Sequence, residues 1–438
     1  MIFPNRIEAE AEFLVHSQTI HLKKIYRTEF AECLNARDYE KICKPLSVLV
    51  HELTHWFDTT STLWGQKYLY ELYDVYYYTI LHTKGVGSQR EFGEIESEWW
   101  RAIKLDCEDS RILFPKYYKE YYKNEKDKFT YGAVNITYSC GVEFSIDGKV
   151  NYKKPIFFVR LLDENNLSIA RIPLTVGALL ESSAVCAELL SRCASIDKIS
   201  QPHAKIIEKR KLHEELDYLL SSCGLVDYTV ARHMVMKENN VSDILDSYLI
   251  SSIISFICLN LSDNYFDRII PPATLHFIPN DRIESFKKNR DRTFVFACLC
   301  IGCGKFSGDM SKIYSFIDSG LSVIGLPPYA SIIKQSYISM LNIRDSIYHR
   351  CPTDKTLSYI LSVGRSNFLK RSEENIPTNT MSLMCGNATL PKFFDAEQEI
   401  FNFGSNSLNE NYFNYEYMYF LDLDINVFIG KLRDACKI

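Results

Sequence analysis

The sequence predicts an α+β protein that is mainly helical and has a small antiparallel sheet in its first half. Apolar residues recur at helical spacing over residues 38–83, over 175–195 and through most of the chain after residue 205. Residues 129–172 instead alternate between apolar and polar side chains, as antiparallel strands with one buried face do. We therefore expect an α+β region over residues 1–202, followed by a mainly helical region over 203–438.

The part of the chain that precedes the strands is expected to be mostly helical. Residues 8–34 have the pattern of an extended segment followed by a helix, and residues 38–83 have that of one long helix. Pro45 suits the first turn of this helix, where its missing N–H costs no hydrogen bond. Gly85-Val86-Gly87-Ser88 ends the helix, and residues 91–127 return to a helical pattern.

Two turn-forming segments divide residues 129–172 into strands. Asp147-Gly148 is a tight-turn dipeptide that predicts a hairpin. Asp163-Glu164-Asn165-Asn166 lies between two apolar stretches and predicts a second hairpin. Thr175 has the side chain of a helix N-cap, so we expect a helix from there to about Ser195.

The charge and the apolar pattern limit the classes of partner and the cellular compartment that we expect. The formal net charge is −5 and no long basic run occurs, which argues against nucleic-acid binding. The longest apolar runs, 248–261 and 293–301, are shorter than the roughly 20 residues that cross a bilayer, so we expect them to be buried and not in a membrane. Residues 1–10 lack the pattern of a secretory signal, and 14 cysteines without such a signal argue for reduced thiols in a cytoplasmic protein.

One cysteine cluster has the spacing of half a zinc site. Cys300 and Cys303 form a CxxC pair, with Cys298 just before it, but the sequence has no second CxxC pair. The surrounding residues are apolar, and buried cysteines behave as small hydrophobic side chains. We therefore expect these three cysteines to be buried without a metal.

The chemistry-bearing motif is His51-Glu52-Leu53-Thr54-His55. Two histidines four residues apart project from one face of a helix, so both imidazoles can bind one metal ion. Glu52 is then placed to remove a proton from a water on that ion. Apolar neighbours at helical spacing indicate that this helix is buried, namely Leu46, Leu49, Val50, Leu53 and Phe57. The alternative is a pair of surface histidines on an amphipathic helix.

A catalytic zinc ion takes three protein ligands and keeps a fourth position for water. Glu181 is the best candidate for the third ligand, because its helix is almost wholly small or apolar and a metal would remove the cost of burying its carboxylate. Glu94, Glu98 and Asp109 are the alternatives. Glu181 could also belong, with Glu188, to the polar stripe of a surface helix.

Two further acids are expected to support the ligands without binding the metal. Asp58 lies on the same stripe as the histidines, but about 10 Å along the helix axis from His51, which is too far for direct ligation. Glu188 lies two turns beyond Glu181 and could orient a ligand or accept a hydrogen bond from a histidine N–H.

The pentapeptide with a glutamate on a later helix resembles the gluzincin branch of zinc metallopeptidases. The segment Leu179-Leu180-Glu181-Ser182-Ser183-Ala184 is also similar to an LLExxA segment in poorly characterised bacterial zincin-like proteins. The resemblance covers about residues 40–195 and implies a zincin-like catalytic region. The chain departs from the metzincin pattern, because Ser61 stands where a third ligand would be, and from the thermolysin-like pattern, because the glutamate-bearing helix is far downstream.

The motif and the resemblance together predict a zinc-dependent metallopeptidase that acts on a protein or peptide substrate. His51, His55 and Glu181 would bind Zn²⁺, Glu52 would be the general base, and a strand within 129–172 would pair with the substrate backbone. One alternative is a non-catalytic scaffold or interaction protein that the metal stabilises. Another is a protease effector in a bacterial conflict or defence system. The sequence indicates neither the oxyanion-stabilising residue nor the oligomeric state.

Overall fold

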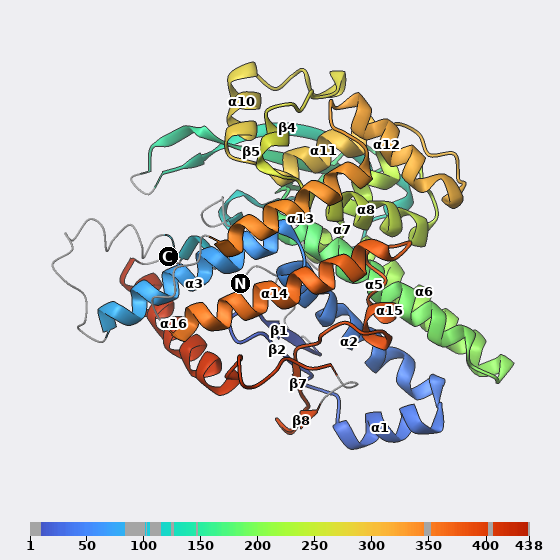
Figure 1. Cartoon of the computed structure of the whole chain (residues 1–438). Coiled ribbons are helices and arrows are strands. Elements are labelled where there is room, and N and C mark those ends of the chain that lie inside the picture. The colour runs from blue at the N-terminus through green and yellow to red at the C-terminus, as the bar shows by residue number, and fades with distance from the viewer. Residues whose placement is uncertain are drawn as a thin grey trace.

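Helices make up most of the structure and pack together with two four-stranded sheets (Figure 1). The computed structural model describes residues 10–83, 101, 103–105, 115–123, 127–145, 148–345, 352–401 and 406–436. The expected α+β class with predominant helix is confirmed. No helix within these residues is both long enough and apolar enough to cross a membrane.

The first sheet combines strands from the two ends of the chain. Its strands are β1 (Glu12–Leu14), β2 (Thr19–His21), β7 (Lys392–Phe394) and β8 (Ile400–Phe401), in the order β1-β2-β7-β8. Strands β1 and β2 form an antiparallel pair, while β7 lies parallel to β2. The sequence predicted an extended segment near residue 12 but neither β7 nor β8.

The expected long helix over residues 38–83 is in fact two helices. After α1 (Arg27–Ala36), α2 spans Tyr39–Thr60 and α3 spans Leu63–Thr83, with Ser61 and Thr62 between them. Gly65 permits the turn, because a Cβ atom there would lie 2.1 Å from the carbonyl oxygen of Thr59. Apolar periodicity is insensitive to a close backbone contact of this kind, so it did not indicate the break.

The second sheet is antiparallel and confirms both predicted hairpins. Its strands are β3 (Glu120–Tyr121), β4 (Asn135–Phe144), β5 (Val150–Leu162) and β6 (Ser168–Pro173), in the order β3-β6-β5-β4. The helix expected over 91–127 is wrong in its last part, where Pro115–Tyr118 forms a short 3-10 turn before β3. Residues 91–100 lie outside the described ranges.

Helix α5 (Val176–Asp197) begins where the sequence predicted. The Thr175 hydroxyl accepts a hydrogen bond from the Ala178 N–H at 3.2 Å, as an N-cap does. Helix α5 packs against α2 on one side and against α7 and α8 on the other. The remaining helices are α6 (Pro202–Ser221), α7 (Val226–Glu238), α8 (Ile244–Leu259), α9 (Asp263–Phe266), α10 (Asn280–Lys288), α11 (Arg292–Gly302), α12 (Ile313–Val323), α13 (Tyr329–Asp345), α14 (Pro352–Glu373), α15 (Thr380–Cys385) and α16 (Tyr415–Cys436).

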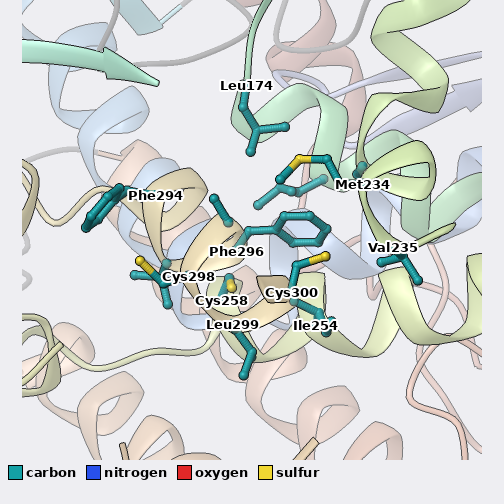
Figure 2. Close-up of a cluster of buried hydrophobic side chains, with 14 of the residues drawn as sticks. Leu174, Met234, Val235, Ile254, Cys258, Phe294, Phe296, Cys298, Leu299 and Cys300 are labelled. Atoms are coloured by element: carbon teal, nitrogen blue, oxygen red, sulfur yellow. The ribbon is translucent and has the colours of Figure 1, made fainter. Parts of the chain in front are cut away.

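The two longest apolar runs form buried helices, as expected. They lie in α8 and α11, and their side chains meet in the core next to the second sheet (Figure 2). Cys298, Cys300 and Cys303 are part of this core. Burial raises the pKa of the Cys298 and Cys300 thiols well above its ordinary value. The predicted burial of these cysteines is confirmed, and such thiols are poor sources of the thiolate that binds metals.

Helix α14 crosses the end of α2 at a glycine. A Cβ atom at Gly364 would lie 2.0 Å from the carbonyl oxygen of Thr60, which is backbone and cannot rotate away. We expect Gly364→Ala to lower the free energy of unfolding by about 1–3 kcal/mol, the usual cost of overpacking. Chemical denaturation would measure this loss, with Ser362→Ala on the exposed side of the same helix as the control. Equal stability of the two variants would contradict close packing at this crossing.

Candidate metal centre

The two histidines of the motif lie on the buried side of α2, one helical turn apart. His51 is 8% exposed and His55 is 2% exposed. Their Nε2 atoms are 3.2 Å apart, and their rings meet edge to face. The interpretation of this pair as surface histidines is therefore wrong, because the apolar stripe of α2 buries the face that carries them.

Glu181 reaches the same point from α5. Its side chain is 2% exposed, and its two carboxylate oxygens lie 3.5 Å from His51 Nε2 and 3.5 Å from His55 Nε2. Small side chains surround it on α5, which lets this helix pack closely on α2. Within the described part of the chain, this is the one group of three or more His, Cys, Asp or Glu side chains whose ligand atoms are close enough to share an ion.

The spacing of these donor atoms fits a tetrahedral metal ion. Metal–ligand distances of 2.0–2.1 Å place neighbouring donors of a tetrahedron about 3.3 Å apart. The two imidazole nitrogens are 3.2 Å apart, and each lies 3.5 Å from a different oxygen of Glu181. One ligand atom from each of the three residues lies within 4.8 Å of the other two, so a small adjustment of the side chains would bring them to a shared ion. Glu181 Oε2 is buried, and its contact with His51 Nε2, at 3.5 Å, is longer than an ordinary hydrogen bond. Since a buried carboxylate oxygen needs a partner, this atom also fits the role of a ligand.

Glu188 orients His51 from the second turn beyond Glu181. His51 Nδ1–H donates a hydrogen bond to Glu188 Oε2 at 3.0 Å, which leaves Nε2 directed at His55 and Glu181. Burial lowers the pKa of His51, but the hydrogen bonds and negative charges of Glu181 and Glu188 outweigh burial and raise it to about 10. The two carboxylates therefore create a negative potential that favours a cation at this position.

Glu52 lies beside the histidines and is held by a backbone group of the first sheet. The Phe13 N–H of β1 donates a hydrogen bond to Glu52 Oε2 at 2.9 Å. Glu52 is partly exposed, unlike the three clustered side chains. Strand β1 therefore fixes the direction of the Glu52 carboxylate without burying it.

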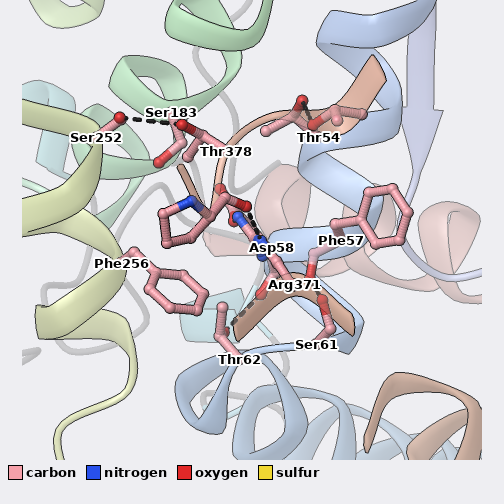
Figure 3. Close-up of polar contacts among 12 residues, drawn as sticks. Thr54, Phe57, Asp58, Ser61, Thr62, Ser183, Ser252, Phe256, Arg371 and Thr378 are labelled. Carbon is pink, nitrogen blue, oxygen red and sulfur yellow. Dashed lines mark hydrogen bonds and ion pairs between the residues drawn. The ribbon is translucent and has the colours of Figure 1, made fainter. Parts of the chain in front are cut away.

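Asp58 contacts Arg371 and not the clustered histidines (Figure 3). It is fully buried and forms an ion pair with Arg371 of α14. Burial raises the pKa of Asp58, while the charge and hydrogen bond of Arg371, together with a hydrogen bond from Ser183, lower it in part. Ser183 is two residues from Glu181 on α5. Asp58 thus joins α2 to α5 and α14, and the direct contact with a histidine that we expected of a supporting acid is made by Glu188.

Arg371 extends this network to the segment before α15. Its Nε donates a hydrogen bond to the Pro377 carbonyl at 2.7 Å, and its guanidinium lies over the Phe256 ring at 4.8 Å. The next residues are held by hydroxyl pairs. Thr378 is 3.1 Å from Ser252, and Thr380 is 2.7 Å from Thr54 of the motif. The region from Arg371 to Thr380 therefore packs directly behind the motif helix.

The structure brings together His51, His55 and Glu181, and Glu188 contacts His51. Glu52 follows His51 on the same helix and contacts the Phe13 N–H. The alternative ligands Glu94, Glu98 and Asp109 lie outside the described residues. Sequence reasoning missed Phe13 and Arg371. Phe13 contributes only a backbone N–H, and Arg371 follows Lys370 in a run that reads as a charged helix end, so neither has a local signal.

Comparisons with protein-family models, with curated proteins and with solved structures found no match to this chain. The resemblance to gluzincins therefore stays a prediction from the motif.

We expect Arg371→Met to lower the free energy of unfolding by about 3–5 kcal/mol, because it leaves the carboxylate of Asp58 buried without its partner. The double variant Asp58→Asn, Arg371→Met should recover part of that loss, since neither charge remains. Urea denaturation of the two single variants and the double variant gives the coupling energy. A loss for Arg371→Met of only about 0–1 kcal/mol, as for an exposed pair, would contradict this account.

Proposed function

We propose that this protein is a zinc-dependent metallopeptidase in which His51, His55 and Glu181 hold the ion and Glu52 is the general base. The observation that carries the proposal is the meeting of two imidazoles from α2 with a buried carboxylate from α5, beside a partly exposed glutamate. Two imidazole nitrogens and one carboxylate oxygen form a donor set common in catalytic zinc sites. A site built this way keeps a position for water.

The residues around the ion would divide the chemistry between them. Bound zinc would supply a Lewis acid that lowers the pKa of a water and polarises a carbonyl group. Glu52 would accept the proton of that water and pass it to the leaving amine. The Phe13 N–H would hold one oxygen of Glu52 during this transfer, and Glu188 would keep His51 in the tautomer that presents Nε2.

A peptide backbone is the substrate that the neighbouring strand favours. Strand β1 contacts Glu52 and stands at one end of the strand order among the described residues. An extended peptide beside β1 would lie close to Glu52, although the Phe13 N–H of that edge is already bonded to the Glu52 carboxylate. Pairing of the substrate with a strand within 129–172 therefore stays part of the proposal. We further propose a cytoplasmic protease, on the basis of its many cysteines.

A non-catalytic scaffold that the metal stabilises is the second candidate. Burial of His51, His55 and Glu181 is compatible with it. Structural zinc sites, however, are closed by four protein ligands, and the cluster in the described residues offers three. A role as a protease effector in bacterial conflict would use the same chemistry.

We expect the purified protein to carry about one zinc ion per chain, and Glu181→Gln to lose most of it, since an amide oxygen is a much poorer zinc ligand. Elemental analysis would measure the metal, and circular dichroism would check the fold. Asp197→Asn is the matched control, because Asp197 is an exposed acid on the same helix. Full zinc in Glu181→Gln with loss of zinc in Glu94→Gln, Glu98→Gln or Asp109→Asn would move the third ligand to that residue.

Glu52→Gln should keep zinc and fold but lose hydrolysis by about 10²- to 10⁴-fold, because glutamine cannot accept a proton. The assay compares peptide fragments in cell extract treated with wild type or with the variant. Glu40→Gln, an exposed position in the first turn of α2, should act like wild type. Identical fragments from wild type and Glu52→Gln, with zinc bound in both, would favour the scaffold over the enzyme.

A further inference from the structure

The last helix, α16, has apolar side chains on two opposite faces. Met418, Leu421 and Ile429 are buried in the core beneath the first sheet. Phe420, Leu423 and Val427 point outward and are 64%, 42% and 55% exposed. Figure 1 shows α16 in red at the edge of the molecule, near β1 and β2. A helix that packs only against its own chain needs one apolar face, so the second face requires an explanation.

The outward residues form one narrow stripe with opposite charges at its two ends. Glu416, Phe420, Leu423, Val427 and Lys431 follow one another at spacings of four, three, four and four residues, which keeps them on one side of an α-helix. All five are exposed. Among the described residues, neither Glu416 nor Lys431 takes part in an ion pair. We call these five residues the α16 stripe.

The α16 stripe is complementary to itself when two copies run antiparallel. If the two-fold axis passes between Leu423 and Asp424, Phe420 faces Val427 of the partner subunit, and Leu423 lies level with Asp424 of the partner subunit. The same arrangement places Glu416 opposite Lys431 of the partner subunit at both ends of the helix pair. A contact of this kind is the same on both subunits, which is the commonest form of protein dimer.

Two further features favour a second helix over other occupants. Gly430 is next to the stripe, and a Cβ atom there would meet nothing within 4 Å, so a second backbone can approach closely. Helices that bind membrane surfaces instead have Lys and Arg around their apolar face. The exposed residues around this stripe include Asp424 and Asp434, whose charges would oppose an anionic lipid surface.

From the exposed apolar residues, the charged ends and the open glycine, we propose that α16 forms a two-fold antiparallel helix pair with a second copy of this chain. The inner face of α16 packs on the first sheet, where Tyr419 stacks on His21 of β2 at 6.4 Å and Asp422 lies 3.6 Å from His16. The dimer would thus form on the sheet whose first strand holds Glu52. The proposal does not depend on the metal centre or on catalysis.

The area of the α16 stripe determines how tightly we expect the two copies to associate. One helix pair with three apolar residues from each copy buries less than the roughly 1,600 Å² of a standard interface. We therefore expect a dimer in rapid exchange with monomer, and its fraction should rise with protein concentration.

Sedimentation velocity of the full chain over a wide range of protein concentrations tests the proposal. The mass should rise from 50.8 kDa toward twice that value. Leu423→Glu should keep the protein monomeric at every concentration, because it places two carboxylates at the centre of the pair. Leu369→Glu is the matched control, since Leu369 is also 42% exposed and lies on a helix, α14, and it should dimerise like wild type.

Charge reversal tests the antiparallel direction. Glu416→Lys should shift the monomer–dimer midpoint to higher concentration, because it opposes Lys431 of the partner subunit. The double variant Glu416→Lys, Lys431→Glu should restore the wild-type midpoint. A wild-type chain that stays monomeric throughout would overturn the proposal, and so would a dimer that survives Leu423→Glu. A double variant no better than Glu416→Lys would overturn the antiparallel arrangement.

Discussion

The packing of α5 against α2 is the contact on which the candidate site depends. It buries the Glu181 carboxylate within 3.5 Å of two imidazoles, and an isolated buried carboxylate would be costly. The charge of His51, or a metal ion in its place, offsets that cost. The small residues of α5 allow this approach, and the Thr175 cap fixes where the helix starts. The register of α5 relative to α2 therefore decides whether the three side chains meet.

Parts of the chain that are far apart in sequence hold α2 in place. Strand β1 contacts Glu52 from one side, while Arg371 of α14 binds Asp58 from the other. A buried ion pair of this kind adds little net stability, because both charges lose their water, but it penalises any packing that separates them. The parallel pairing of β7 with β2 joins the first and last parts of the chain in one sheet. Glu52 and the helix that carries His51 and His55 are thus positioned by residues from both halves of the sequence.

The helix α16 connects the core beneath the first sheet to the protein surface. Its inner face completes the core under the first sheet, and the α16 stripe faces outward. A dimer through the stripe would cover apolar area that a monomer leaves in water. Because the inner face is already packed, α16 would be ordered before it met a second copy, which reduces the entropy lost on association.

The sequence by itself determined the features that depend on near neighbours. Helical spacing predicted a buried motif helix with His51 and His55 on one face, and turn residues predicted both hairpins of the second sheet. The prediction of Glu181 also depended on near neighbours, because it rests on a single acid among the small and apolar residues of one helix. Only the tertiary structure decided the pairing of β7 with β2 and the contacts of Phe13 and Arg371. These features depend on which distant segments pack together. The apolar pattern of one segment indicates that it is buried, but it does not indicate which other segment covers it.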